Sequence, residues 1–151
     1  MPSISLRVQK LKAAHPTLTF TQSEHFSWSP SEQTIFYTPQ HPHAAALLLH
    51  ELSHALLKHR QYHYDIELIA METAAWKEAE KQAATYNTRL EDAVVQDHLD
   101  TYRDWLHARS TCPECSANGY QLRAATYQCP ACSHQWRVNE ARLCALRRYS
   151  A

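Results

Sequence analysis

The spacing of hydrophobic residues divides the chain into segments of helical and of extended character. After Ser3, apolar residues recur at helical spacing until Pro16, which stops the predicted helix. Further on, short stretches rich in Thr, Phe, Tyr and Trp favour strands, and Ser and Pro between two of them favour a turn. We therefore expect strands at residues 17–20, 26–28 and 34–38, and helices at residues 65–89 and 90–107.

One segment, residues 44–57, is apolar nearly all round and should form a central helix that Pro42 opens. Its few polar residues include His50 and His54, which stand four positions apart and therefore lie on one face of the helix. Most of the leucines gather on the opposite face, so the two histidines point into a separate space. Together with the preceding strands, this pattern predicts an α+β fold in which a small antiparallel sheet packs on a helical core.

The two histidines belong to the motif His50-Glu51-Leu52-Ser53-His54, which fits a zinc site. Imidazoles at positions i and i+4 of a helix can bind one Zn²⁺, and Glu51 between them is placed to act as the base for a zinc-activated water. The alternative is a structural histidine pair that binds no metal. We predict His50 and His54 as ligands of a catalytic zinc and Glu51 as the catalytic base.

A catalytic zinc usually takes three protein ligands, so a third must come from another segment. On a helical wheel of residues 65–89, Glu72 falls at the centre of the apolar stripe, where a carboxylate is costly unless it is paired or metal-bound. Glu72 is therefore the predicted third ligand. Glu78 and Glu67 project from the opposite, solvated face and remain alternatives. His59 also remains one, although a helix that stayed regular to residue 60 would turn it away from the histidine pair.

The histidine motif is followed by Glu72, Ala75 and Ala79 in the pattern Glu-x-x-Ala-x-x-x-Ala, which resembles the ImmA/IrrE-type metallopeptidases of the gluzincin group. The resemblance covers residues 40–85. It implies a zinc-dependent endopeptidase that cleaves a protein partner in a regulatory or repair role, which could include a DNA-associated protein.

A second metal signal follows, in which two Cys-Pro-x-Cys knuckles are separated by thirteen residues. Each knuckle directs two thiolates to one ion, and four cysteines leave no open position, so this zinc should be structural. Two disulfides or an iron site of rubredoxin type are the alternatives. The predicted ligands are Cys112, Cys115, Cys129 and Cys132, whereas Cys144 is expected to be a buried thiol of a last helix.

A peptidase helix pair followed by a zinc ribbon also resembles the SprT-like family, which joins these parts in the same order. We predict two domains, a metallopeptidase domain at residues 1–108 and a zinc ribbon with a C-terminal helix at residues 109–151. Their cofactors would be one catalytic and one structural Zn²⁺. Tyr62, His63 and Tyr64 are candidates for a donor that stabilises the oxyanion of the reaction.

Charge and composition constrain the partners and the location. Lys and Arg balance Asp and Glu, so the chain as a whole offers no electrostatic argument for nucleic acid. Locally, the ribbon and tail are basic and could contact single-stranded nucleic acid, although a packed hairpin and a solvated tail are the simpler interpretation. The residues concerned are Arg109, Arg123, Arg137, Arg142, Arg147, Arg148, Tyr120, Tyr127 and Trp136.

No segment is apolar enough for a signal peptide or a membrane span, which predicts a cytoplasmic protein without membrane contact. These observations together predict a zinc-dependent metalloendopeptidase. The alternative is an adaptor in which the zinc ribbon binds nucleic acid or protein and the peptidase core is silent.

Overall fold

The computed structural model describes residues 3–139 and 148–150 and confirms the α+β class. The chain forms two compact units, and two helices contribute residues to both. The first unit consists of Met1–Arg60 and Met71–Val95, and the second of Gln61–Ala70 and Gln96–Ala151. The domain boundary at residue 108 stays a prediction.

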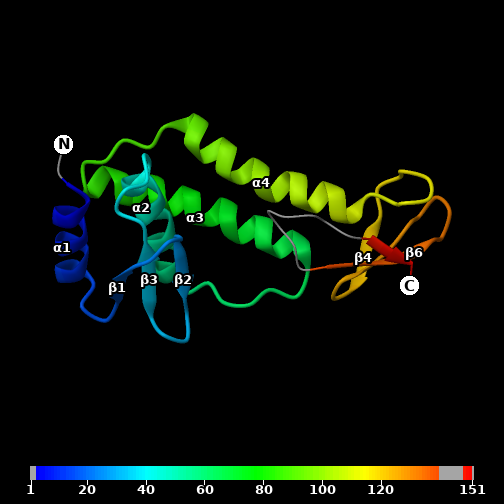
Figure 1. Cartoon of the computed structure of the whole chain (residues 1–151), viewed down its shortest axis with the longest axis horizontal. Coiled ribbons are helices and arrows are strands. Elements are labelled where there is room, and N and C mark those ends of the chain that lie inside the picture. The colour runs from blue at the N-terminus through cyan, green and yellow to red at the C-terminus, as the bar shows by residue number, and fades with distance from the viewer. Residues whose placement is uncertain (1–2, 140–147, 151) are drawn as a thin grey trace. The chain divides into compact units, whose positions relative to one another are not determined.

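The first unit begins with a helix and a small sheet (Figure 1). These elements are α1 (Ile4–Ala14), β1 (Thr19–Gln22), β2 (Ser27–Ser29) and β3 (Thr34–Tyr37). Strand β3 is central, with β2 antiparallel and β1 parallel to it. The sheet is therefore mixed. The predicted antiparallel pairing is found for β2 and β3, whereas β1 pairs with β3 in parallel.

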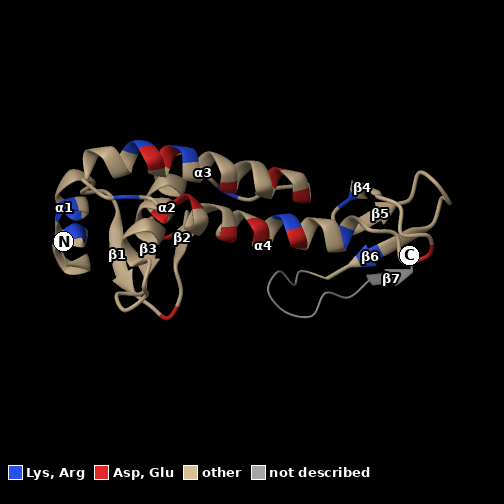
Figure 2. Ribbon diagram, turned by 90° about the horizontal axis from the view of Figure 1, so that it is seen from above, with Lys and Arg blue, Asp and Glu red and all other residues tan. Residues whose placement is uncertain are grey.

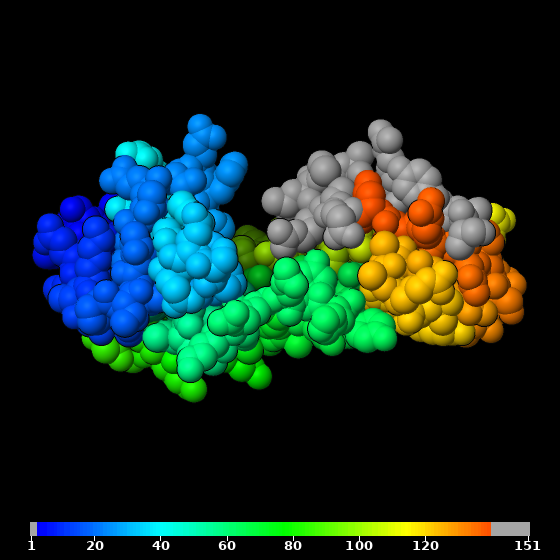
Figure 3. Space-filling model, turned by 90° about the horizontal axis from the view of Figure 1, so that it is seen from below, coloured from blue at the N-terminus to red at the C-terminus, as the bar shows by residue number. Residues whose placement is uncertain are grey.

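Helix α2 (Ala44–Leu56) packs on strands β2 and β3 of this sheet. Leu48 and Leu52 of the helix and Ile35 of β3 are almost completely buried, which places the core of the unit between helix and sheet. Figure 3 shows one face of this unit, with α1 and the strands in blue to cyan. Helix α2 packs on the sheet through its leucine face. Burial of these leucines therefore determines the direction in which His50 and His54 point.

Helices α3 (Asp65–Thr85) and α4 (Asp92–Ser110) complete the helical part. Helix α3 is capped at its start, because the carboxylate of Glu67 accepts hydrogen bonds from the backbone N–H groups of His63 (2.7 Å) and Tyr64 (3.3 Å). At its other end, Asn87 takes a left-handed conformation with φ of 48°, which Asn tolerates. Acidic and basic residues mix along α3 in Figure 2, as expected for a solvated outer face.

The second unit contains a four-stranded antiparallel sheet in the order β4-β5-β6-β7. Its strands are β4 (Tyr120–Arg123), β5 (Thr126–Gln128), β6 (Gln135–Val138) and β7 (Arg148–Ser150). Strands β4 and β5 form the hairpin predicted between the cysteine knuckles. The rings of Tyr127 and Trp136, 2% and 0% exposed, stack at a centroid distance of 5.8 Å in the core of this sheet.

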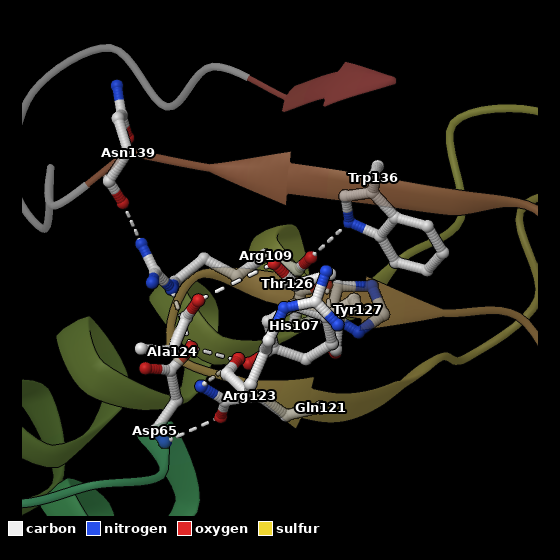
Figure 4. A network of polar contacts seen from close by, with 11 residues as sticks. Asp65, His107, Arg109, Gln121, Arg123, Ala124, Thr126, Tyr127, Trp136 and Asn139 are labelled. Carbon is white, nitrogen blue, oxygen red and sulfur yellow. Dashed lines mark hydrogen bonds and ion pairs between the residues drawn. The ribbon is translucent and has the colours of Figure 1, made fainter. Parts of the chain in front are cut away.

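A buried polar network joins the first turn of α3 to the sheet and to the end of α4 within the second unit (Figure 4). Arg109 Nε donates a hydrogen bond to Asp65 Oδ2 at 2.8 Å, and the hydroxyl of Tyr127 donates to the same oxygen. The guanidinium also donates to the backbone carbonyl of Asn139, and Trp136 Nε1 donates to the carbonyl of Arg109 at 2.9 Å. Every charged group in this network is thereby matched by a partner.

Some predictions concern residues outside the described part of the chain. The C-terminal helix with Cys144, and the arginines Arg142 and Arg147, fall on residues 140–147. Arg148 lies in strand β7. Among the described residues, no helix is both long enough and apolar enough to cross a membrane.

Candidate metal centres

Three of the predicted ligand atoms converge on one point in the first unit. His50 Nε2 and Glu72 Oε2 are 2.8 Å apart, His54 Nε2 lies 3.1 Å from His50 Nε2, and His54 Nε2 lies 3.3 Å from Glu72 Oε2. Donor atoms about 2.0–2.1 Å from a tetrahedral zinc are separated by about 3.3 Å. The three atoms therefore fit three corners of such a site, with small adjustments of the side chains.

The surroundings of the cluster shield it from solvent. His50 and Glu72 are 1% and 5% exposed, and the ring of Trp76 stacks on the imidazole of His50 at a centroid distance of 4.3 Å. Burial alone would raise the pKa of Glu72, but hydrogen bonds from the two histidines and their charges lower it well below its usual range. Glu72 is thus held as a carboxylate, which is the form that binds a metal.

Glu51 is buried beside this cluster and is only 8% exposed. Burial raises the pKa of Glu51 to about 7, with a smaller upward contribution from the charge of Glu72 and a downward one from His54. A carboxyl group with such a pKa can both take up and release a proton near neutral pH. This is the property that a general base in a hydrolytic site needs.

The helix does not stay regular to residue 60, so the geometric argument that turned His59 away from the histidine pair does not apply. Helix α2 ends at Leu56, and Lys58 takes a left-handed conformation with φ of 57°, which turns the chain back. His59 Nδ1 thereby lies 2.8 Å from His54 Nδ1, the nitrogen on the far side of the ring from the ligand cluster. His59 is therefore placed to orient His54, as an outer hydrogen-bond partner does in many metal sites.

The remaining candidates for the third ligand have other contacts. Glu67 caps the start of α3, as described above. Glu78 accepts a hydrogen bond from Gln82 Nε2 (2.9 Å) and pairs with Lys81 Nζ (3.3 Å) on the outer face of α3. Tyr62, His63 and Tyr64, the candidate oxyanion donors, belong to the second unit, and their role stays a prediction.

The four predicted cysteines of the ribbon form one cluster, in which their sulfur atoms all lie within 4.8 Å of one another. Cys112 and Cys132 are 3.7 Å apart, and Cys115 and Cys129 are 3.4 Å apart. Thiolates about 2.3 Å from a tetrahedral zinc are separated by about 3.8 Å, so the cluster fits one metal ion. The distances also exclude a disulfide in this structure, because an S–S bond measures about 2.0 Å.

The two knuckles have the same backbone geometry. The N–H groups of Ser116 and Ser133 donate to the carbonyls of Cys112 (2.9 Å) and Cys129 (3.0 Å), and both serines take left-handed conformations with φ of 65° and 63°. Burial would raise the pKa of the Cys129 thiol, but N–H groups of Cys132 and Ala131 lower it to about 7. Each turn thus presents its thiolates in the same way, which suits a metal site built from two halves.

The residues proposed for nucleic-acid contact are largely inside the second unit. Arg109, Tyr127 and Trp136 are at most 2% exposed and belong to the buried network and the sheet core. Tyr120 is 48% exposed, and Arg123 and Arg137 are exposed. The described part of the ribbon therefore supports the interpretation as a packed hairpin.

The described residues thus define an α+β protein with two candidate metal centres of different donor type, one of four thiolates and one of two imidazoles and a carboxylate. No protein-family model, no curated protein and no solved structure matches the chain.

Proposed function

We propose that the chain is a zinc-dependent metalloendopeptidase that resembles the ImmA/IrrE type. The observation that carries the proposal is the convergence of three ligand atoms of His50, His54 and Glu72, 2.8–3.3 Å apart, beside the buried carboxyl group of Glu51. A structural histidine pair would not require a titratable acid at this position. The motif and its geometry support the same assignment.

In this proposal each residue of the cluster has one task. His50, His54 and Glu72 would hold the ion, and a bound zinc would polarise a peptide carbonyl and make water nucleophilic near neutral pH. Glu51 would take the proton of the attacking water on its carboxylate and later give it to the leaving amine. His59 would keep the ring of His54 in its ligating orientation.

The four cysteines would bind a second zinc with a structural task. Four thiolates leave no position for water, so this ion would hold the two knuckles together and contribute to folding rather than to chemistry. The burial of Arg109, Tyr127 and Trp136 weighs against a nucleic-acid adaptor as the main function.

The proposal is tested by incubating a mixture of cellular proteins with wild type and with Glu51→Gln, and by mapping new N-termini through mass spectrometry. We expect new N-termini with wild type and a rate lower by about 10²–10⁴ with Glu51→Gln, because the variant lacks the base but keeps all ligands. Glu80→Gln, which changes an exposed acid of α3, is the matched control and should keep full activity. Equal proteolysis by wild type and Glu51→Gln, or none by zinc-loaded wild type, contradicts the proposal.

A further inference from the structure

A pocket of about 360 Å³ lies at the C-terminal end of α2, within the first unit. Its volume falls within the range of ligand pockets, about 300–1,000 Å³. The loop that follows α2 forms one wall with Lys58, His59 and Arg60, and the segment after α1 forms another with Thr17 and Leu18. The pocket is therefore built from parts that the core of the first unit already positions.

His59 connects this pocket to the candidate zinc site. Its ring lines the pocket, and its Nδ1 lies 2.8 Å from Nδ1 of the predicted ligand His54. The loop is also tied to the sheet, because Trp28 Nε1 of strand β2 donates to the carbonyl of His59 at 3.1 Å. A group bound in the pocket next to His59 would therefore be separated from the predicted ligand His54 only by the imidazole of His59.

The charges around the pocket have one sign. Lys58 and Arg60 are exposed cations on its wall, and among the described residues that line it none is Asp or Glu. Trp28 and Leu18 add apolar surface that can pack against a short aliphatic stem. The lining thus suits a group with a negatively charged end and a few methylenes, which describes the side chain of Glu or Asp.

Strand β2 offers a way for an extended chain to reach this pocket. Among the described strands, β2 pairs only with β3, so its other edge is open to a further strand. Trp28 belongs to β2 and also lines the pocket. A peptide added to this edge would send alternate side chains to one side, and one of them could enter the pocket.

We propose that this pocket, walled by Lys58, His59 and Arg60, is a substrate subsite that selects an acidic side chain of the protein that is cleaved. The proposal rests on the proposed peptidase function, because it treats the bound group as part of a peptide. It adds a specificity that the catalytic residues alone do not supply.

The test measures binding without cleavage. Immobilised zinc-loaded Glu51→Gln protein is exposed to a pool of random octapeptides with blocked ends, and retained peptides are sequenced. We expect enrichment of Glu or Asp at one position of the retained peptides, and about tenfold less of it when Lys58→Asn and Arg60→Gln are added. Asn is chosen at position 58 because it tolerates the left-handed conformation found there.

A control with the same change in net charge is Lys12→Gln with Lys77→Gln, two exposed lysines away from the pocket, which should leave the enrichment unchanged. Absence of acidic enrichment, or equal enrichment in the Lys58/Arg60 variant, overturns the inference. So does retention of inorganic phosphate or of an oligonucleotide by this pocket in preference to acidic peptides. Because no bond is broken in this assay, its failure is separate from a failure of proteolysis by wild type.

Discussion

Helix α3 carries two buried carboxylates, Asp65 and Glu72, whose surroundings differ in kind. Asp65 faces the guanidinium of Arg109 at 2.8 Å and the hydroxyl of Tyr127, so a permanent positive charge balances it. Glu72 faces two imidazoles, whose charge depends on pH, at 2.8 and 3.3 Å. The first arrangement is complete in the protein alone, whereas the second has the donor atoms of a candidate metal site.

This difference separates a structural network from a candidate metal site. A buried carboxylate paired with Arg contributes to one fixed arrangement, and removal of either partner leaves an unbalanced charge. Two imidazoles, once they have lost any extra proton, and a carboxylate direct lone pairs at one point, which suits a divalent cation. Glu72 and Asp65 are both at most 5% exposed, so burial alone would not distinguish their roles.

The substitution Asp65→Asn should have the largest effect of those that test the difference between the two carboxylates. The substitution keeps the shape of the side chain but leaves the buried guanidinium of Arg109 without a counterion, which should lower the free energy of unfolding by about 3–5 kcal/mol. Urea unfolding of the zinc-loaded protein measures this loss, with Asp100→Asn, an exposed acid of α4, as control. A loss below about 1 kcal/mol would show that the two carboxylates are not different in the way we describe.

Gly119 tests how tightly the second unit is packed. It is the only glycine of the chain, and a Cβ at this position would clash with the buried ring of Trp136. We expect Gly119→Ala to lower the free energy of unfolding by about 1–3 kcal/mol, because the ring or the backbone must shift. The candidate site of the first unit should keep its zinc affinity in this variant, which a metal titration checks.

A substitution of His59 tests whether its contact with His54 contributes to zinc binding at the first site. His59→Phe keeps a ring but removes the nitrogen that meets His54, so zinc affinity at this site should fall by about 10–100-fold. His25→Phe, at an exposed histidine of the same unit, is the control and should have no effect. Competition with a chromophoric chelator measures the zinc affinities. An unchanged affinity in His59→Phe would show that His59 does not orient His54.

Most of the fold and of the candidate sites follows from patterns that are local in the sequence. The periodicity of α2 and the apolar stripe of α3 are enough to bring Glu72 to the two histidines. The repeated knuckle sequence is enough to predict the cluster of four cysteines. In both cases a regular spacing within each element determines which of its side chains can point at a common site.

The parts that escaped prediction depend on unusual turns or on distant partners. Left-handed conformations are commonly marked by glycine, but here Lys58 adopts one, so the end of α2 and the return of His59 carried no sequence signal. The parallel pairing of β1 with β3 and the burial of Arg109 against Asp65 arise from contacts far apart in sequence. Hydrophobic periodicity does not contain this information.

The most direct test of the central claim is the zinc content of carefully prepared protein. We expect two zinc ions per chain in wild type, one in Glu72→Ala, where the cysteine cluster alone should remain loaded, and one in Cys112→Ser with Cys115→Ser, where the first site should remain loaded. Glu78→Ala, on the outer face of the same helix, should keep both. A single zinc in wild type, or two in Glu72→Ala bound as tightly as before, would contradict the account.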